Sequence, residues 1–557
     1  MEKRIFSAVL ISIALLWLWA AVAPKLFPDL IKQARPNTPA KAVAAKKEAP
    51  AQSTAAAATA ASSTSVPATV AATAPAAKPA VAVAPTSAQA VELTRVETPD
   101  YIATFSNRGA ELISFRLQHY FTKPKGGQPV ELVKARDPQR SDFPFAIESR
   151  DANTAARLNT ALFEVDNRVV NGSGALEFHY VEADGLTATK TFHFSNQYLF
   201  DFAVSVSPSM PYRVVVGPGL RTLEPDEQDN RFTMTGNGVV QRDDSLKMIN
   251  REKSDRTNVF GDVQFVGTED NYFLSVLRPE KASGAVIRAG EFVAGKEKRR
   301  ELYAGLNSTP DGTVAGGAFF GPKETALLDR YGFEKTLQFG TFGIIARFFL
   351  VVLQWLNKFT RNWGWAIIIL TILIKVVLYP LQHKWMLSMK KIQKVQPKME
   401  AIKAKYRKHK SDPEQRQKMN TEMMKLYQVE GINPAGGCLP MVIQFPIFLG
   451  FYNLLSHAIE LRGAPFMLWI HDLSAKDPTY VLPILMTIAM FIQQMITPTS
   501  ADPAQRRMFL IMPIVFGWIF KEFPSGLVVY WLVQNILTIV QQMITNRYWK
   551  DHPTATA

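Results

Sequence analysis

The sequence predicts a polytopic α-helical membrane protein that also carries a large all-β domain. Three observations support this fold class. The second half contains apolar runs of about 20 residues, the length that crosses a hydrocarbon core of about 30 Å. Residues 91–340 instead alternate apolar and polar side chains, as half-buried strands do. Because Cys438 is the only cysteine, no internal disulfide can stabilise the all-β domain, and its own core must do so.

The N-terminal 90 residues divide into two segments. Residues 1–23 have a basic head and an apolar run, a pattern shared by cleaved signal peptides and membrane anchors. Pro24 directly follows a possible cleavage site, which favours an uncleaved transmembrane anchor, and Lys3 and Arg4 place its N-terminus in the cytoplasm. Residues 24–90 are rich in alanine and proline and cannot bury a core, so we expect a flexible linker.

Residues 91–340 are predicted to form an exported β-sandwich. Apolar side chains recur at every second position in 176–180 and again in 200–206. Turn sequences recur between such runs, and no strand alternates with a clear helix. The segment contains no metal-ligand spacing, phosphate-binding loop or nucleophile motif, so we expect no catalytic residue, metal or cofactor.

Residues 341–360 resemble a membrane span, but they are predicted to lie flat at the interface. Arg347, Gln354 and Lys358 fall on one stripe of a helical wheel. A true crossing here would also place the basic segment 384–432 outside the cell, against the positive-inside rule.

The run at about 363–383 is a transmembrane span with an ammonium group near its centre. Lys375 lies too deep for an ordinary flanking charge, and such a charge costs roughly 2.5–3.5 kcal/mol on insertion scales. The flexible Lys375 side chain could extend so that its ammonium group reaches the cytoplasmic headgroups. Thr371 lies four residues earlier on the same helix face, which favours a polar, partly hydrated groove.

Residues 384–432 form a basic cytoplasmic segment with 13 Lys or Arg against five Asp or Glu. We expect two antiparallel helices, the first kinked or broken at Pro397 and the second beginning after the N-cap Asp412. The net charge of +15 could indicate nucleic acid, but its concentration on one side of the spans indicates membrane topology and no DNA. The segment either only fixes topology or also docks anionic partners such as lipid headgroups or ribosomal RNA, with these candidate docking residues: Lys403, Lys405, Arg407, Lys408 and Lys410.

Four more spans are predicted, at about 434–455, 479–496, 507–522 and 525–545. Arg506 and Arg507 mark a cytoplasmic connection, so six spans with both termini inside satisfy the charge pattern. Residues 361–549 then form one helical core, and 550–557 form a cytoplasmic tail.

Four motifs in this core closely resemble the YidC/Oxa family of membrane-protein insertases. They are NPAGGCLP at 433–440, QFPIF at 444–448, APFMLWIHDL at 464–473 and FPSGL at 523–527. The resemblance covers about 341–549. The anchor, linker and β domain resemble the Gram-negative layout of the family, which implies a periplasmic domain of the supersandwich type and a five-helix core in the inner membrane.

The resemblance also implies a hydrophilic groove that is open to the cytoplasm and to lipid. The family's groove arginine falls on Lys375, a departure that keeps the positive charge but loses the planar guanidinium fork. The other groove positions of the family fall on residues that contribute either polar or bulky side chains: Thr371, Gln444, Phe448, Met486, Tyr530 and Trp531.

The implied function is that of an insertase and chaperone for nascent membrane proteins, acting alone or beside the Sec translocon. Ribosomes, targeting factors and anionic lipids are the expected further partners. Such a protein performs no covalent chemistry and is not an enzyme. A polytopic transporter or channel with an intramembrane lysine site is the alternative, although no Asp or Glu interrupts the interiors of the spans. An anchored envelope carbohydrate enzyme is a weaker alternative, because fold alone does not carry function.

Overall fold

The computed structural model describes residues 86–551 except for 125, 134–142, 196, 222–235, 252–255, 295–296, 407–411, 432–438 and 498–502. The predicted anchor, most of the predicted linker, and residues 552–557 of the predicted tail lie outside the described residues. The same holds for most of the NPAGGCLP motif and for Arg407, Lys408 and Lys410.

The β domain is built from three sheets whose paired strands run antiparallel. The long sheet has the order β12 (Ser245–Ile249), β11 (Asn237–Arg242), β14 (Phe265–Glu269), β15 (Phe273–Lys281), β18 (Thr313–Pro322), β9 (Leu199–Ser207), β8 (Thr187–Phe194), β7 (Gly174–Val181), β6 (Glu164–Asn167). A second sheet has the order β13 (Asn258–Phe260), β16 (Ala285–Ala294), β17 (Glu297–Asn307), β10 (Tyr212–Val216), β5 (Ala146–Ser149). The third has the order β1 (Leu93–Glu97), β2 (Tyr101–Ser106), β3 (Glu111–Phe121), β4 (Pro129–Glu131).

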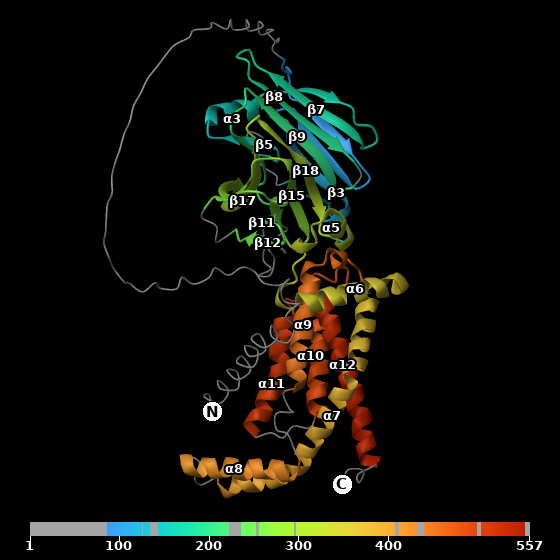
Figure 1. The fold of residues 1–557 in the computed structure, drawn as a ribbon. Coiled ribbons are helices and arrows are strands. Elements are labelled where there is room, and N and C mark those ends of the chain that lie inside the picture. Colours follow the sequence, from blue (N-terminus) through green and yellow to red (C-terminus); the bar gives the residue numbers. More distant parts are fainter. Residues whose placement is uncertain are drawn as a thin grey trace, which may run out of the picture. The chain divides into compact units, whose positions relative to one another are not determined.

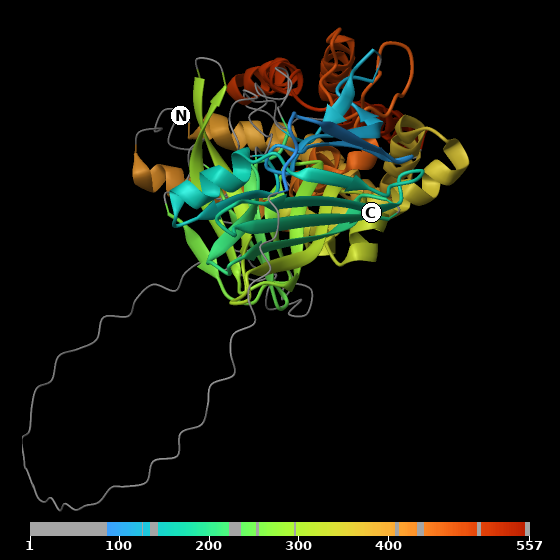
Figure 2. The ribbon, with the colours of Figure 1, turned by 90° about the horizontal axis from the view of Figure 1, so that it is seen from above.

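The period-two pattern of the sequence corresponds to buried and exposed faces of these strands. In β9, Phe200, Phe202, Val204 and Val206 are buried, while Asp201 is exposed between them. The neighbouring strands β8 and β18 pair with β9 on its two sides, and all three lie side by side in Figures 1 and 2. Because adjacent strands bury the same face, their aromatic side chains pack into one core, and the predicted all-β domain is confirmed.

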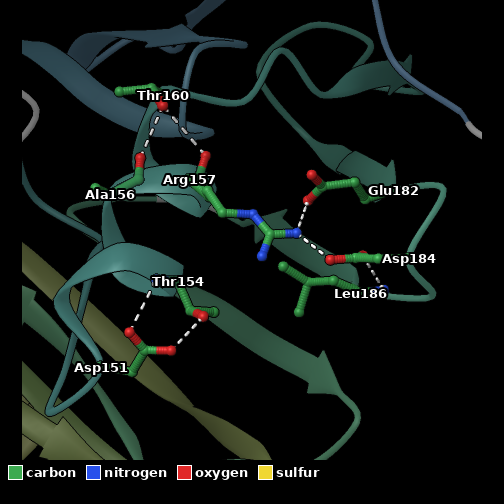
Figure 3. Close-up of polar contacts among 8 residues, drawn as sticks. All are labelled: Asp151, Thr154, Ala156, Arg157, Thr160, Glu182, Asp184 and Leu186. Atoms are coloured by element: carbon green, nitrogen blue, oxygen red, sulfur yellow. Dashed lines mark hydrogen bonds and ion pairs between the residues drawn. The ribbon is translucent and has the colours of Figure 1, made fainter.

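Among the described residues of the β domain there are two short helices, α3 (Ala152–Thr160) and α5 (Thr325–Tyr331), and the sequence pattern predicted neither. Asp151 caps α3 by accepting hydrogen bonds from the backbone N–H groups of Asn153 and Thr154. Arg157 then pairs with Glu182, 2.6 Å away, and with Asp184 in the turn between β7 and β8 (Figure 3). The helix is therefore held by its cap, by an exposed ion-pair cluster and by the buried Leu158 and Asn159, and a nine-residue helix with so few buried positions gives little apolar periodicity to detect.

The helical part begins with the short turns η1 (Glu334–Thr336) and η2 (Gly340–Phe342) and continues to residue 551. Its longer elements are α6 (Gly343–Thr360), α7 (Trp363–Lys405), α8 (Pro413–Val429), α9 (Leu439–His457), α10 (Val481–Ile496), α11 (Pro503–Phe520) and α12 (Ser525–Asp551), with the turn η5 (Ile459–Leu461) after α9. Three described helical stretches are long and apolar enough to cross a membrane, namely 340–360, 363–392 and 525–547. Two shorter apolar helices lie at 481–496 and 510–520.

Of the two expectations at Pro397, a kink or a break, the structure contradicts only the break, because helix α7 is continuous through this residue. It is one element of 43 residues that contains both Pro380 and Pro397. Beyond the apolar run, Ile392, Val395 and Met399 are buried against side chains of α8. This packing offsets the hydrogen bond that a proline removes from a helix, so the predicted span and the first helix of the basic hairpin are continuous.

Helix α6 lies across the axes of α9 and α10 rather than along them (Figure 1). Its buried side chains, which include Phe349 and Leu353, face α7 and α9. An apolar stripe on the other side is exposed and consists of Ile344, Phe348, Val351, Trp355 and Phe359.

The start of α7 is fixed by a close approach to the loop after α9. The Asn362 side chain caps the helix by accepting from the backbone of Gly364 and Trp365, and it also donates to the carbonyl of Phe466 at 3.0 Å. A Cβ at Gly364 would lie 2.0 Å from Cδ2 of Phe466. Only glycine fits here, so the APFMLWIHDL motif packs directly on the first turn of α7.

Candidate functional site

Lys375 is held inside the helical bundle by α12. Its side chain is only 7% exposed, and Nζ donates a hydrogen bond to Oγ1 of Thr538 at 2.8 Å. Thr538 in turn donates to the carbonyl of Gln534 at 2.7 Å. The ammonium group therefore has a fixed partner on a neighbouring helix, as expected for an intramembrane charge.

Thr371 shares a helix face with Lys375, as the spacing predicts, but the two side chains have different partners. Thr371 is fully buried, and its hydroxyl donates to the carbonyl of Ile367 in its own helix at 2.7 Å. This arrangement satisfies the hydroxyl locally, so Thr371 contributes a small buried polar surface next to Lys375.

The predicted positions on α9 and α12 come together in pairs. Gln444 Nε2 donates to the Tyr530 hydroxyl at 2.5 Å. Phe448 meets Trp531 edge to face, with ring centroids 5.2 Å apart. Met486 on α10 is fully buried in the same apolar cluster. These residues form a packed aromatic and polar region built from three helices, one of which, α12, also carries the partner of Lys375.

A row of polar side chains on α12 extends this region, and sequence reasoning did not single it out. Its members, here called the polar row, recur at intervals of three or four residues: Gln534, Thr538, Gln541 and Thr545. That interval places them on one helix face. The spacing is visible in the sequence, but glutamine and threonine are common in helices, so the spacing alone does not indicate a site. The contact between Thr538 and Lys375 is what connects these residues with the site.

The segment 458–480 carries carboxyl groups that are held by hydrogen bonds. Burial raises the pKa of Glu460, which accepts a hydrogen bond from the Thr325 hydroxyl of α5 at 3.0 Å. Burial likewise raises the pKa of Asp472, which accepts from the backbone and side chain of Ser474. Within the described ranges, no three His, Cys, Asp or Glu side chains are grouped so that they could hold a metal ion.

Comparison with known proteins decides the family. The model described as 60Kd inner membrane protein matches residues 355–552, and the model of the YidC periplasmic domain matches residues 93–352. The membrane protein insertase YidC of Geobacter metallireducens is 36% identical over 563 residues, which cover 98% of each chain. The chain belongs to the YidC family of membrane protein insertases.

A second YidC insertase, from Citrifermentans bemidjiense, is 37% identical over 569 residues and covers 99% of this chain and all of its own. Among solved structures, YidC from Thermotoga maritima is 14% identical, with a TM-score of 0.29 over 81% of this chain and 99% of that chain. The family assignment confirms the predicted fold class of a helical membrane core with a periplasmic β domain. The family is one of insertases rather than enzymes, and these matches give no support to the transporter alternative.

Proposed function

We propose that this chain inserts nascent membrane proteins into the inner membrane, and that Lys375 contacts the hydrophilic segment of the client during insertion. The observation that carries the proposal is the position of the Lys375 ammonium, inside the bundle and bonded to Thr538. A charge in this position is costly in lipid and is retained where it meets a polar partner.

The driving force needs no cofactor. Transfer of an apolar client helix into lipid releases roughly 0.8 kcal/mol for each buried CH₂ group, and the membrane potential assists acidic segments. The obstacle is the polar segment that must cross. A hydrophilic groove lined by Lys375, Thr371 and Gln444 shortens the dry path, because it offers that segment hydrogen-bonding partners inside the membrane.

Aromatic and apolar positions have a complementary role in the proposal. Phe448, Met486, Tyr530 and Trp531 form the flank along which the apolar segment of the client leaves for lipid. Their packing across α9, α10 and α12 supports this division, because the partly buried Phe448 and Trp531 join the fully buried Met486 and Tyr530 in one apolar cluster.

Helix α6 is proposed to lie flat in the interface between the inner membrane and the periplasm. Its apolar stripe from Ile344 to Phe359 faces away from the protein, while Arg347 is exposed next to that stripe. An apolar face of this kind is buried in the region between headgroups and acyl chains when a helix lies in the membrane plane.

The proposed topology has both termini in the cytoplasm and the β domain in the periplasm, with five spans formed by α7, α9, α10, α11 and α12 and a sixth by residues 1–23. The asymmetric distribution of basic residues supports it. The hairpin formed by the end of α7 and by α8 then lies in the cytoplasm. There it would receive ribosomes and targeting factors and contact anionic lipids, and the chain would work alone or beside the Sec translocon.

The test is the insertion of a client with a short acidic loop by variants of Lys375 at matched expression. Lys375→Arg should retain activity because it keeps the charge, Lys375→Ala should impair insertion client by client, and Lys375→Glu should be worst through repulsion. Lys384, exposed and further along α7, provides the matched control Lys384→Ala, which should insert normally.

A lysine that only reached the headgroups would give another order of activities. Lys375→Leu would be harmless and would stabilise the helix by up to about 2.5–3.5 kcal/mol. Full activity of Lys375→Leu, without crosslinks from position 371 or 531 to an arrested client, would exclude the groove mechanism.

A further inference from the structure

A second lysine of α7 is buried against α12, nearer to the cytoplasm than Lys375. Lys390 is 8% exposed, and its Nζ donates to the backbone carbonyl of Thr545 at 2.8 Å. Thr545 itself is 5% exposed, and its hydroxyl also lies 3.7 Å from the sulfur of Met386. Both buried lysines of α7 therefore contact the same face of α12, at the polar row.

The polar row contains an amide group between these two contacts. Gln541 is 6% exposed, and within the part of the chain that the structure describes neither its Oε1 nor its Nε2 has a hydrogen-bond partner. Oε1 of Gln534, which lies on the other side of Thr538 in the row, also has no hydrogen-bond partner among the described residues. A buried amide without partners costs free energy, so these groups require either water or a polar group from a ligand.

The spacing of the two lysine contacts limits what such a ligand can be. Thr538 and Thr545 are seven residues apart, which corresponds to about 10 Å along a helix. An extended chain covers that distance in about three residues at roughly 3.3 Å each. Ammonium groups pair with carboxylates, and the Gln541 amide can donate to the same kind of oxygen.

We propose that Lys390 and Gln541 form a second contact site for a carboxylate of the client, occupied on the cytoplasmic side before the segment reaches Lys375. The inference rests on the proposed function and extends it to a specificity. Clients with two acidic residues three or four positions apart in an extended segment can engage both lysines at once, so they are preferred over clients with a single acid.

Lys390 also has a purely structural explanation, which the experiment must separate from the proposed one. Its bond to Thr545 ties α7 to α12 near the C-terminal end of α12, where a cation is favoured by the helix dipole. If Lys390 has only a structural role, its substitution should slow the insertion of all clients equally. If Lys390 contacts the client, the effect of the substitution should depend on the charge of the client.

The experiment measures insertion into proteoliposomes that contain the full-length protein, with two clients that differ only in their translocated segment. One client carries two Asp residues three positions apart, and the other carries Asn at both positions. With Lys390→Gln, the acidic client should insert about two- to fivefold more slowly, the factor expected for loss of a partly screened ion pair. The Asn client should be unaffected, and Lys390→Arg should retain the wild-type rate.

Lys391 is the matched control, because it is the next residue and is exposed. Lys391→Gln should leave both rates unchanged. Charge reversal gives the converse readout, since Lys390→Glu should favour a client with two Lys residues over the acidic client. If Lys390→Gln does not accumulate, Gln541→Leu tests the same site and should slow the acidic client alone.

Equal slowing of both clients by Lys390→Gln, or no slowing of either, would overturn the second contact site. Lys375→Leu is measured in parallel with the same clients. Slowing by Lys375→Leu without any by Lys390→Gln removes only this inference, whereas no effect of either variant removes the proposed function as well.

Discussion

At the scale of single residues, Lys190 shows how the β domain accommodates a charge in its core. The side chain is fully buried in β8, and Nζ donates to the carbonyls of Gly109 at 2.6 Å and Phe145 at 2.8 Å. Burial lowers the pKa of Lys190 to about 8, and the charge of Glu111 opposes the shift. The lysine thus joins the long sheet to the loops before β3 and β5. Its burial makes the protonated, charged form unfavourable in the folded state.

This cost should appear as a pH dependence of stability. In the unfolded chain the lysine keeps its ordinary pKa, 10.5. Between pH 8 and about 10 the folded state has already released a proton that the unfolded state still binds. The free energy of unfolding should therefore rise with pH in this window, by up to about 1.4 kcal/mol per unit.

Urea unfolding of the β domain, residues 86–340, followed by circular dichroism at pH 7, 8, 9 and 10, checks this expectation. Lys190→Met provides the comparison, since its unfolding free energy should lack the rise. If the unfolding free energies of the wild-type domain and of Lys190→Met changed with pH in the same way, Lys190 would not titrate in this window.

Lys375 also illustrates what a sequence reveals at this scale and what it hides. A lysine within an apolar run is visible in the sequence, and its functional interpretation needs only the cost of a charge in lipid. Its partner Thr538 is 163 residues away, and the relative rotation of α7 and α12 is set by the packing of many side chains. Nothing local to either helix predicts that pair.

At the scale of elements, the basic hairpin, which is proposed to dock partners, has a small core of its own. Lys405 pairs with Glu422 at 3.1 Å, and Lys398 with Glu430 at 2.6 Å. Apolar side chains of α7 and α8 fill the space between the two helices. These contacts hold the described part of α8 against the end of α7.

Reversing four charges among Lys403, Lys405, Arg407, Lys408 and Lys410 should weaken the binding of ribosomes and targeting factors, with a strong salt dependence. Co-sedimentation at several salt concentrations measures the effect. The exchange Lys405→Glu with Glu422→Lys is the control, because it keeps both the ion pair and the net charge. Wild-type binding by a charge-reversed protein of correct topology would leave the hairpin with a topological role alone.

The elements that the sequence predicted correctly are those with strong periodicity, such as β7, β9 and the apolar helices. The differences from these predictions have physical causes. A break at Pro397, one of the two outcomes expected there, is absent. A proline costs about 3 kcal/mol when its own helix is considered alone, but the contacts of Val395 and Met399 with α8 lie outside any local window. Helix α3 has only nine residues and buries few of them, such as Leu158, while its Asp151 cap and Arg157 ion pairs have no hydrophobic signature.

At the scale of the whole molecule, the two parts of the chain differ in what they contribute to insertion. Every residue proposed to contact the client lies beyond residue 341. Removing residues 100–315 should therefore leave insertion of a simple one-span client largely intact. The deletion keeps α5, and with it the hydrogen bond from Thr325 to Glu460 that connects this helix to the loop after α9.

Insertion assays in cells depleted of the wild-type protein measure this separation. A variant with the same deletion and Lys375→Leu is the matched control, and it should lose activity on an acidic client. Failure of the deletion variant to insert the one-span client, despite normal abundance and orientation, would mean that the β domain takes part in the process itself.

The continuity of α7 also has a mechanical consequence. Thirty residues separate Lys375 from Lys405, about 45 Å of helix at 1.5 Å per residue, and no loop interrupts them. A load applied to the hairpin by a docked particle is therefore transmitted along one backbone to the level of the buried lysine, with Pro380 and Pro397 as the points of lowest bending stiffness. The helix proposed to receive the synthesis machinery is thus the same helix that carries the lysine proposed to contact the client.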